Sequence, residues 1–313
     1  MGINMKIIYM GTPDFAVAPL EAIIRAGHEV TAVVTQPDKQ KGRGKEVQMT
    51  PVKVCAIAHG IPVLQPAKIK AAEAVSELSR YPADIFVVAA FGQFLSEEIL
   101  TMPRFGCVNI HASLLPAYRG AAPIQWAVIN GEEKTGVTVQ QMAKGMDTGD
   151  MLLKKEVIIA PDETGESLHD KLMEAGAELI VEALPLIERG EITPVKQDED
   201  LASYAPKLTK DMGLLNFNSD ALSLERLIRG LNSWPSAYTM YKGKTLKIWE
   251  AQVLKDNQGK APGEIMEVDR EYFDVAAKEG ALRIRSLQLE GKKRMLVKDF
   301  LLGYEISLGM KLG

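Results

Sequence analysis

Short apolar runs alternate with longer amphipathic segments through the first 190 residues. The apolar runs predict strands at residues 6–10, 28–35, 62–64, 84–90, 107–111, 136–142 and 151–159. Segments in which apolar residues recur every three or four positions predict helices at 15–26, 52–58, 69–79, 121–130 and 166–188. Strands that are apolar throughout are typical of a parallel sheet with helices on both faces. The alternation therefore predicts a doubly wound, mostly parallel α/β sheet.

The pattern changes after residue 190. Residues 191–206 are polar, which predicts a linker, and a helix is expected at 222–231. Five short alternating segments follow between turn residues, at 237–241, 246–253, 263–268, 273–276 and 282–289. Short strands at this spacing predict a small β-barrel. We expect an N-terminal domain at 1–190, a linker at 191–207 and a C-terminal domain at 208–313.

The composition is that of a globular protein, since 46% of the 313 residues are hydrophobic and 25% are charged. No apolar run reaches the roughly 18 residues of a membrane helix, so no membrane partner is expected. The whole chain has a net charge of −4. Residues 207–313 hold 18 Lys and Arg against 14 Asp and Glu, a net charge of +4, so residues 1–206 have a net charge of −8. The basic C-terminal part indicates an anionic partner, although an ordinary solvated surface explains the same excess.

The two cysteines, Cys55 and Cys107, lack the spacing of metal ligands and sit in apolar surroundings. Buried free thiols in a reducing cytosol are the expectation, so we predict a cytoplasmic protein without a metal site.

Three polar residues follow strand patterns in the middle of the chain. Asn109 and His111 are two residues apart near the end of one strand, and their side chains should share a face. Asp147 lies just past the next strand. An amide, an imidazole and a carboxylate above strand ends predict an acyl-transfer site, with donors for an oxyanion and a group that accepts a proton. The alternative is structural: a buried histidine that holds a backbone group, and an aspartate that holds a turn.

Other candidate ligand sites surround these strands. Residues 11–15, G-T-P-D-F, lack the later glycines of a dinucleotide fingerprint, which argues against a nicotinamide enzyme. Residues 36–50 form a polar loop that suits phosphates or is simply solvated, with basic residues Lys39, Lys41, Arg43 and Lys45. The run from Phe91 to Leu95 follows a strand, where it either contacts a ligand or belongs to the core.

The sequence resembles the folate-dependent formyltransferases. The shared motifs are N-I-H-A-S-L-L-P at 109–116, Y-R-G-A-A-P-I at 118–124, G-V-T at 136–138 and M-D-T-G-D at 146–150. The resemblance covers essentially the whole chain, through residues 10–15, 36–38, 42–45, 204–210 and 234–235. It implies an α/β catalytic domain, a linker and an OB-like barrel. It is closest to the family members that act on initiator tRNA.

This resemblance implies transfer of the formyl group of 10-formyltetrahydrofolate to the amino group of methionine on initiator tRNA. Asn109 and His111 would donate hydrogen bonds to the formyl oxygen, and Asp147 would accept the proton of the amine. The folate pocket would use two segments: Ser113, Leu114, Leu115 and Pro116, and Phe91, Gly92, Gln93, Phe94 and Leu95.

The same resemblance places the basic loop at the acceptor end of the tRNA, where a weak first base pair marks the initiator. Arg43 is then the residue that selects the tRNA, while Lys39, Lys41 and Lys45 add affinity for phosphates. No metal is implied, and a monomer is expected.

Three rival functions are weighed against this one. An aminosugar-nucleotide formyltransferase shares the catalytic core, but would not be expected to carry the G-R-G-K loop. A glycinamide ribonucleotide formyltransferase is usually a single domain. A tRNA-binding protein without activity would not need Asn109, His111 and Asp147 together.

Overall fold

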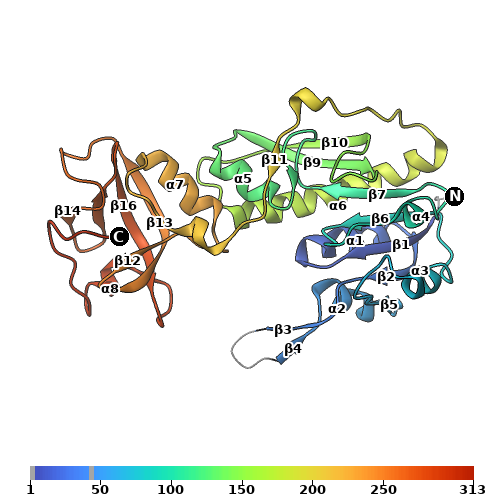
Figure 1. Ribbon diagram of the computed structural model, residues 1–313, viewed down its shortest axis with the longest axis horizontal. Helices are drawn as coiled ribbons and strands as arrows, with labels where there is room; N and C mark the ends of the chain where they lie inside the picture. Colours follow the sequence, from blue (N-terminus) through green and yellow to red (C-terminus); the bar gives the residue numbers. More distant parts are fainter. Residues whose placement is uncertain (1–3, 42–45) are drawn as a thin grey trace. The chain divides into compact units, whose positions relative to one another are not determined.

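The computed structural model describes residues 4–41 and 46–313, which form two compact units (Figure 1). Unit 1 contains the described residues up to Pro123, together with Lys134–Ile158 and His169–Ala205. Unit 2 contains Ile124–Glu133, Ile159–Leu168 and Pro206–Gly313. None of the described helices has the length and apolar character needed to cross a membrane.

Unit 1 is built on a seven-stranded sheet in the order β10-β9-β7-β6-β1-β2-β5. Neighbouring strands are parallel among β1 (Lys6–Gly11), β2 (Glu29–Val34), β5 (Val63–Leu64), β6 (Ile85–Ala89) and β7 (Cys107–His111). β9 (Lys134–Gln141) runs antiparallel to β7, and β10 (Met151–Ile158) runs antiparallel to β9. The predicted doubly wound, mostly parallel sheet is confirmed.

Helices cover both faces of this sheet because its central strands are apolar on both sides. They are α1 (Val17–Arg25) with the 3-10 turn η1 (Asp14–Ala16), α2 (Pro51–Ala58), α3 (Ala72–Leu78), α4 (Glu97–Leu100) and α6 (Gly165–Arg189). Residues of α3 and α4 share one buried cluster with Phe86 of β6 and Cys107 of β7. On the opposite face, Ile110 of β7 packs against Gly176 of α6. A Cβ added to Gly176 would lie 3.0 Å from the Ile110 side chain.

The described parts of the basic segment, residues 36–41 and 46–50, contain a strand pair that its composition does not predict. β3 (Lys39–Lys41) and β4 (Glu46–Gln48) form an antiparallel pair, with Lys39 opposite Gln48. An ion pair between Asp38 and Lys53 of α2 holds its base, and Gln65 donates to the same carboxylate at 2.7 Å. Lys53 and Gln65 lie outside the segment, so its own sequence does not reveal these contacts.

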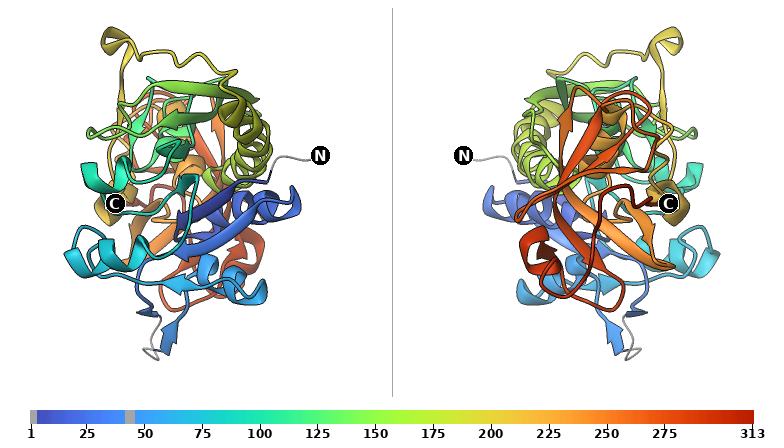
Figure 2. Two further views of the ribbon diagram at one scale, coloured as in Figure 1. Left: turned by 90° about the vertical axis from the view of Figure 1, so that its right-hand side faces the viewer. Right: turned by 90° about the vertical axis from the view of Figure 1, so that its left-hand side faces the viewer.

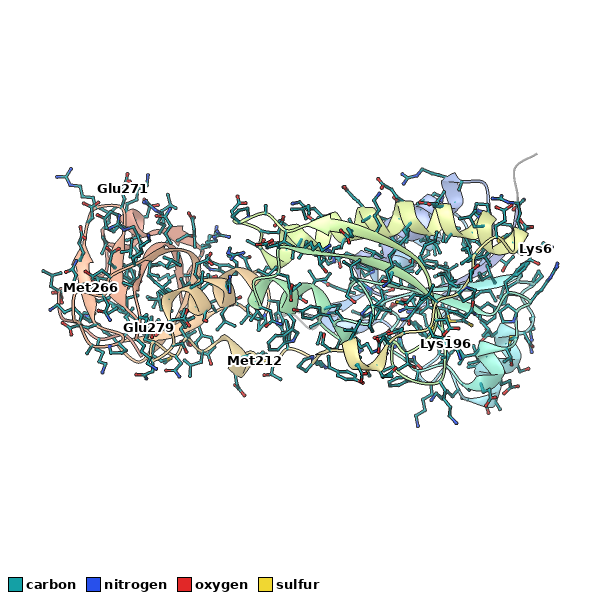
Figure 3. The ribbon with its side chains drawn as sticks, turned by 90° about the horizontal axis from the view of Figure 1, so that it is seen from above. Lys6, Lys196, Met212, Met266, Glu271 and Glu279 are labelled. Atoms are coloured by element: carbon teal, nitrogen blue, oxygen red, sulfur yellow. The ribbon has the colours of Figure 1, made fainter. Side chains whose placement is uncertain are left out.

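The segment predicted as a linker belongs to unit 1 as far as Ala205. Val195 and Met151 exchange backbone hydrogen bonds, η2 (Glu199–Leu201) follows, and β11 (Tyr204–Ala205) pairs in parallel with β8 (Arg119–Gly120). Figure 3, in which Lys196 is labelled, shows this segment running along the unit.

Unit 2 contains an antiparallel sheet in the order β12-β13-β16-β15-β14, with β17 paired to β16. Its strands are among the orange and red ribbons of Figure 2. Its elements are η3 (Lys210–Gly213), α7 (Ala221–Gly230), β12 (Tyr238–Tyr241), β13 (Lys244–Leu254), β14 (Ile265–Val268), β15 (Phe273–Ala276), β16 (Ala281–Leu289), β17 (Met295–Leu296) and α8 (Val297–Phe300). Its core includes Phe273 and Phe300. The five predicted strands are present, and they form a half-barrel.

The helix α5 (Pro123–Ile129) belongs to unit 2, except for its first residue. It approaches α7 closely, because a Cβ added to Gly230 would lie 2.5 Å from the Ile129 side chain. The Trp126 indole donates to the backbone oxygen of Pro206 at 2.9 Å.

Candidate active site

Asn109 and His111 lie on β7, next to β9 on one side and with β6 on the other. Asn109 is level with Gln140 of β9, and His111 is level with Thr138. The strand alternates, so Ile110 points to the α6 face while its two neighbours point away from it. Asn109 is half-buried, and its amide makes no hydrogen bond within the described residues. Its donor hydrogens are therefore available to a ligand.

The His111 ring is buried and has a partner on each side. Nε2 lies 3.0 Å from the backbone oxygen of Tyr118, which can only accept, so Nε2 carries a hydrogen and donates it. Nδ1 lies 3.6 Å from Oδ1 of Asp147, which suits an ion pair but is beyond hydrogen-bond distance. The Tyr118 contact thus fixes the ring, and Nδ1 remains the nitrogen that faces the carboxylate.

The Asp147 carboxylate is held by two donors. The backbone nitrogen of Gly120 lies 2.9 Å from Oδ2, and Nε2 of Gln140 lies 3.0 Å from Oδ1. Asp147 itself has φ of 53°, in the left-handed region that costs most residues stability. The loop therefore needs outside support to keep the carboxylate beside His111.

That support comes from the segment predicted as a linker. Nε2 of Gln197 donates to the backbone oxygens of Asp147 and Gly149, each at 2.7 Å. Its Oε1 accepts from Nε of Arg119 at 2.9 Å. Arg119 is fully buried and pairs through two nitrogens with Glu199, at 2.9 and 2.8 Å. Gln197 thus braces the Asp147 loop from 50 residues away in the chain, and Glu199 holds the arginine that Gln197 accepts from.

The turn at 113–116, expected at the folate site, is pinned from inside. Thr138 of β9 donates to the Ser113 backbone oxygen at 2.7 Å and accepts from the Leu115 nitrogen at 3.1 Å. The hydroxyl of Ser113 donates to the backbone oxygen of Ala117 at 2.6 Å. The Lys154 ammonium donates to the Leu115 oxygen, and burial lowers the pKa of Lys154. Ser113 and Leu115 are buried, so the half-buried Leu114 and Pro116 are the members left to contact a ligand.

The run from Phe91 to Leu95 divides between core and surface. Phe91 and Leu95 belong to the buried cluster under α3 and α4. Gln93 bonds the Ile69 nitrogen and the Pro66 oxygen, at 2.8 and 3.1 Å. Gly92 is exposed, and Phe94 is 56% exposed. The prediction that all five residues bind folate is untested, and the exposed Phe94 ring is the flat surface that this run offers.

The basic residues of the 36–50 segment are described only in part. Lys39 is exposed at the start of β3. Lys41 ends that strand, whereas Arg43 and Lys45 lie outside the described residues.

Sequence reasoning missed two residues that touch the Asp147 loop. Gln140 had a readable signal, since Thr138 and Gln140 are polar residues two apart in an otherwise apolar strand. Gln197 had none, because it lies in a polar segment where glutamine is unremarkable.

An amide, an imidazole and a carboxylate at the strand ends of a doubly wound sheet, followed by a small half-barrel, define an enzyme of the acyl-transfer type. The chain belongs to the formyl transferase family, because residues 5–184 match the family model described as formyl transferase and residues 207–305 match that described as formyl transferase, C-terminal domain.

Its relatives include two proteins named methionyl-tRNA formyltransferase. The protein from Agathobacter rectalis is 53% identical over 305 residues, which cover 97% of this chain and 98% of that one. The protein from Lachnospira eligens is 52% identical over 315 residues and covers 99% and 100%.

Solved structures with the same fold are much less similar in sequence. The N-formyltransferase from Helicobacter canadensis, in complex with folinic acid and dTDP-3-aminofucose, has a TM-score of 0.67 at 19% identity, covering 94% of this chain and 100% of that one. HypX from Aquifex aeolicus in complex with tetrahydrofolic acid has a TM-score of 0.65 at 18% identity, covering 96% of this chain and 47% of that one. At such identities these structures show the fold alone.

Proposed function

We propose that this chain transfers the formyl group of 10-formyltetrahydrofolate to the amino group of methionine on initiator tRNA. The geometry of Asn109, His111 and Asp147 supports the reaction. The choice of substrate rests on the relatives named methionyl-tRNA formyltransferase, which are about half identical along both units. We infer a monomeric cytoplasmic enzyme in which residues 1–190 form the catalytic domain, 191–207 the linker and 208–313 the tRNA-binding domain.

In this mechanism the methionine amine attacks the formyl carbon. A C–N bond forms to the amine, the bond from the formyl carbon to the folate nitrogen breaks, and tetrahydrofolate leaves. Negative charge develops on the formyl oxygen, which the free Asn109 amide and His111 stabilise. Asp147 accepts one proton from the methionine ammonium, which becomes the neutral amine that attacks, and this proton passes on to water. After the attack the amine nitrogen gives up a second proton, which the departing folate nitrogen takes, so the atoms and charges balance.

Gln140 has the arrangement of a group that positions the amine. The residue is 2% exposed, and its Oε1 is a buried oxygen without a hydrogen-bond partner in the described residues. A buried unpaired acceptor is costly unless a ligand satisfies it. Since Nε2 of Gln140 already holds Asp147, its Oε1 is suited to accept a hydrogen from the amine beside that carboxylate.

Selection of the tRNA would come from elsewhere. The acyl-transfer groups recognise an amine and a formyl carbon, and nothing in them distinguishes initiator from elongator tRNA. We propose that Arg43 makes this distinction by favouring an acceptor end whose first base pair is weak or absent. Separating the two strands there costs less free energy than at a fully paired end. Lys39, Lys41 and Lys45 would contact phosphates without discrimination.

The test supplies the protein with 10-formyltetrahydrofolate and methionine-charged initiator or elongator tRNA. We expect formylation of the initiator species with strong preference, and loss of that preference in Arg43→Ala at unchanged folate affinity. A dTDP-aminosugar added as a competing acceptor should remain unmodified. Equal transfer to both tRNAs, or transfer to the aminosugar alone, would refute the assignment.

A further inference from the structure

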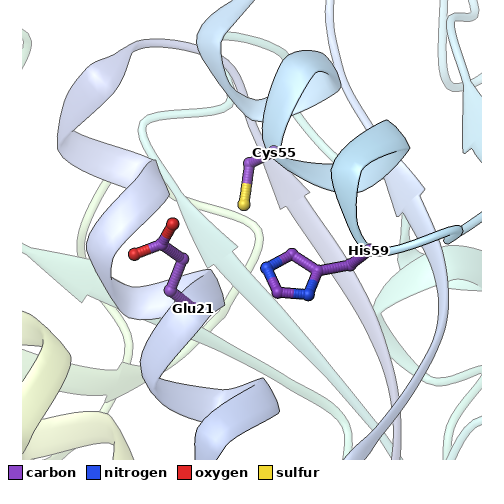
Figure 4. A group of neighbouring side chains, drawn as sticks. All are labelled: Glu21, Cys55 and His59. Atoms are coloured by element: carbon purple, nitrogen blue, oxygen red, sulfur yellow. The ribbon is translucent and has the colours of Figure 1, made fainter.

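A second cluster of chemically capable side chains lies on α1 and α2, among residues that the proposed formyl transfer does not use. Glu21 comes from α1, while Cys55 and His59 come from α2 and its C-terminal cap (Figure 4). One carboxylate oxygen, the thiol sulfur and one ring nitrogen all lie within 4.8 Å of one another. We propose that these three side chains bind one divalent cation of the Zn²⁺ type.

The fold brings these groups together in two ways. Cys55 and His59 are four residues apart, so they lie on one side of a helical turn. α1 and α2 pack side by side, which places Glu21 opposite them. Cys55 is 7% exposed, Glu21 is half-buried and His59 is exposed. The cluster thus has a buried floor and an open side from which a cation and a water molecule could enter.

The ligand set matches the preferences of Zn²⁺. This ion takes thiolate, imidazole and carboxylate ligands at about 2.0–2.3 Å in tetrahedral geometry, with water completing open sites. Such bonds place neighbouring ligand atoms about 3.3–3.8 Å apart. A cluster already within 4.8 Å therefore needs to contract by little more than about 1 Å. Glu21 and His59, which are not buried, can make that adjustment by side-chain rotation.

Within the part of the chain that the structure describes, the three groups have no competing partners. Across residues 4–41 and 46–313, none of these side chains forms a hydrogen bond with another protein group. Burial, and then the Glu21 carboxylate, raises the pKa of the Cys55 thiol, so the thiol is neutral until a cation displaces its proton. A bound cation would offset the charge of the carboxylate and the thiolate, and would join α1 to α2. The site would therefore stabilise unit 1 and take no part in catalysis.

The experiment uses the full-length, untagged protein after treatment with a chelator. Zn²⁺ is titrated in competition with a chromophoric chelator, and Co²⁺ is then added to look for thiolate-to-metal absorption. We expect one equivalent of Zn²⁺, a rise in melting temperature with metal, and thiolate absorption with Co²⁺. Cys55→Ser and His59→Gln should lose the tight site, and Glu21→Gln should weaken it at least tenfold.

Two matched controls separate this site from adventitious binding. Cys107→Ser removes the other buried thiol, and His169→Gln removes a histidine beside Asp14 and Asp170 but no thiol. Both should bind one equivalent as the wild type does. Because His59 is exposed, His59→Gln should fold and retain formyl transfer, which keeps the test informative if Cys55→Ser is unstable. Failure of the wild type to bind, or equal binding by His59→Gln, would overturn the proposal.

Discussion

The Gln197 brace makes a quantitative prediction about the Asp147 loop. In Gln197→Ala, two hydrogen bonds of 2.7 Å to the backbone oxygens of Asp147 and Gly149 are lost. Each is worth about 0.5–1.5 kcal/mol net, so the loop loses about 1–3 kcal/mol of restraint. The Nε donor of the fully buried Arg119 also loses its acceptor, which lowers the free energy of unfolding by about a further 1–3 kcal/mol.

The restraint matters because Asp147 occupies a left-handed conformation that its own backbone does not favour. If the loop must be reordered in the transition state, 1–3 kcal/mol corresponds to a decrease in kcat of about 5- to 150-fold. KM for folate and for tRNA should change little, because Gln197 contacts the loop and not the proposed ligands. Steady-state formyl transfer at 25 °C, with urea unfolding of the same preparation, measures both effects.

Asp198→Ala is the matched control. Asp198 stands next to Gln197 but is exposed, and its carboxylate only accepts from the Asp200 nitrogen at the start of η2. The kcat of Asp198→Ala should remain within about twofold of the wild type, because loss of this exposed cap destabilises only the start of η2. Wild-type kcat in Gln197→Ala, or a purely KM effect, would show that the contact does not position Asp147.

Three further predictions follow from single contacts. Gly149→Ala should abolish most activity, because an added Cβ would lie 1.7 Å from the Gln141 backbone oxygen and must displace the loop; wild-type turnover would refute this. Arg283→Ala should lower the urea stability of unit 2 by about 3–5 kcal/mol, because Asp274 is 2% exposed and loses a bidentate partner, and a loss under 1 kcal/mol would contradict it. The hydrogen bond from Arg119 lowers the pKa of Glu199 below its ordinary value of 4.5. Its stabilisation is therefore complete above about pH 4.5 and is lost as pH falls through the lowered pKa, so the urea midpoint should fall more steeply on acidification than in Glu199→Gln.

Much of the fold could be predicted from the sequence because the relevant information is local. Continuous apolar runs predict buried parallel strands, and β7 begins and ends at the predicted residues. The two-residue repeat of a strand likewise places Asn109 and His111 on the same face. The position of Asp147 just past the next strand likewise makes its carboxylate a candidate proton acceptor, and the resemblance adds which proton it would take.

Other features depended on contacts between distant segments. The polar run at 191–206 has the composition of a linker, yet Gln197 holds the Asp147 loop. Phe91 and Phe94 are both aromatic residues after a strand, but one is buried under α3 and α4 and the other is exposed. Composition cannot distinguish these cases, because the side of the chain that is covered depends on which helix packs there.

By itself, the sequence determined the order of strands and helices, the two-part architecture and the shared face of Asn109 and His111. All of these follow from periodicities of two or 3.6 residues, which neighbouring side chains encode. The tertiary structure alone decided which nitrogen of His111 faces Asp147, which glutamines hold that carboxylate and its loop, and that Glu21 meets Cys55. Such contacts depend on sheet order and helix packing, which join residues that no local pattern relates.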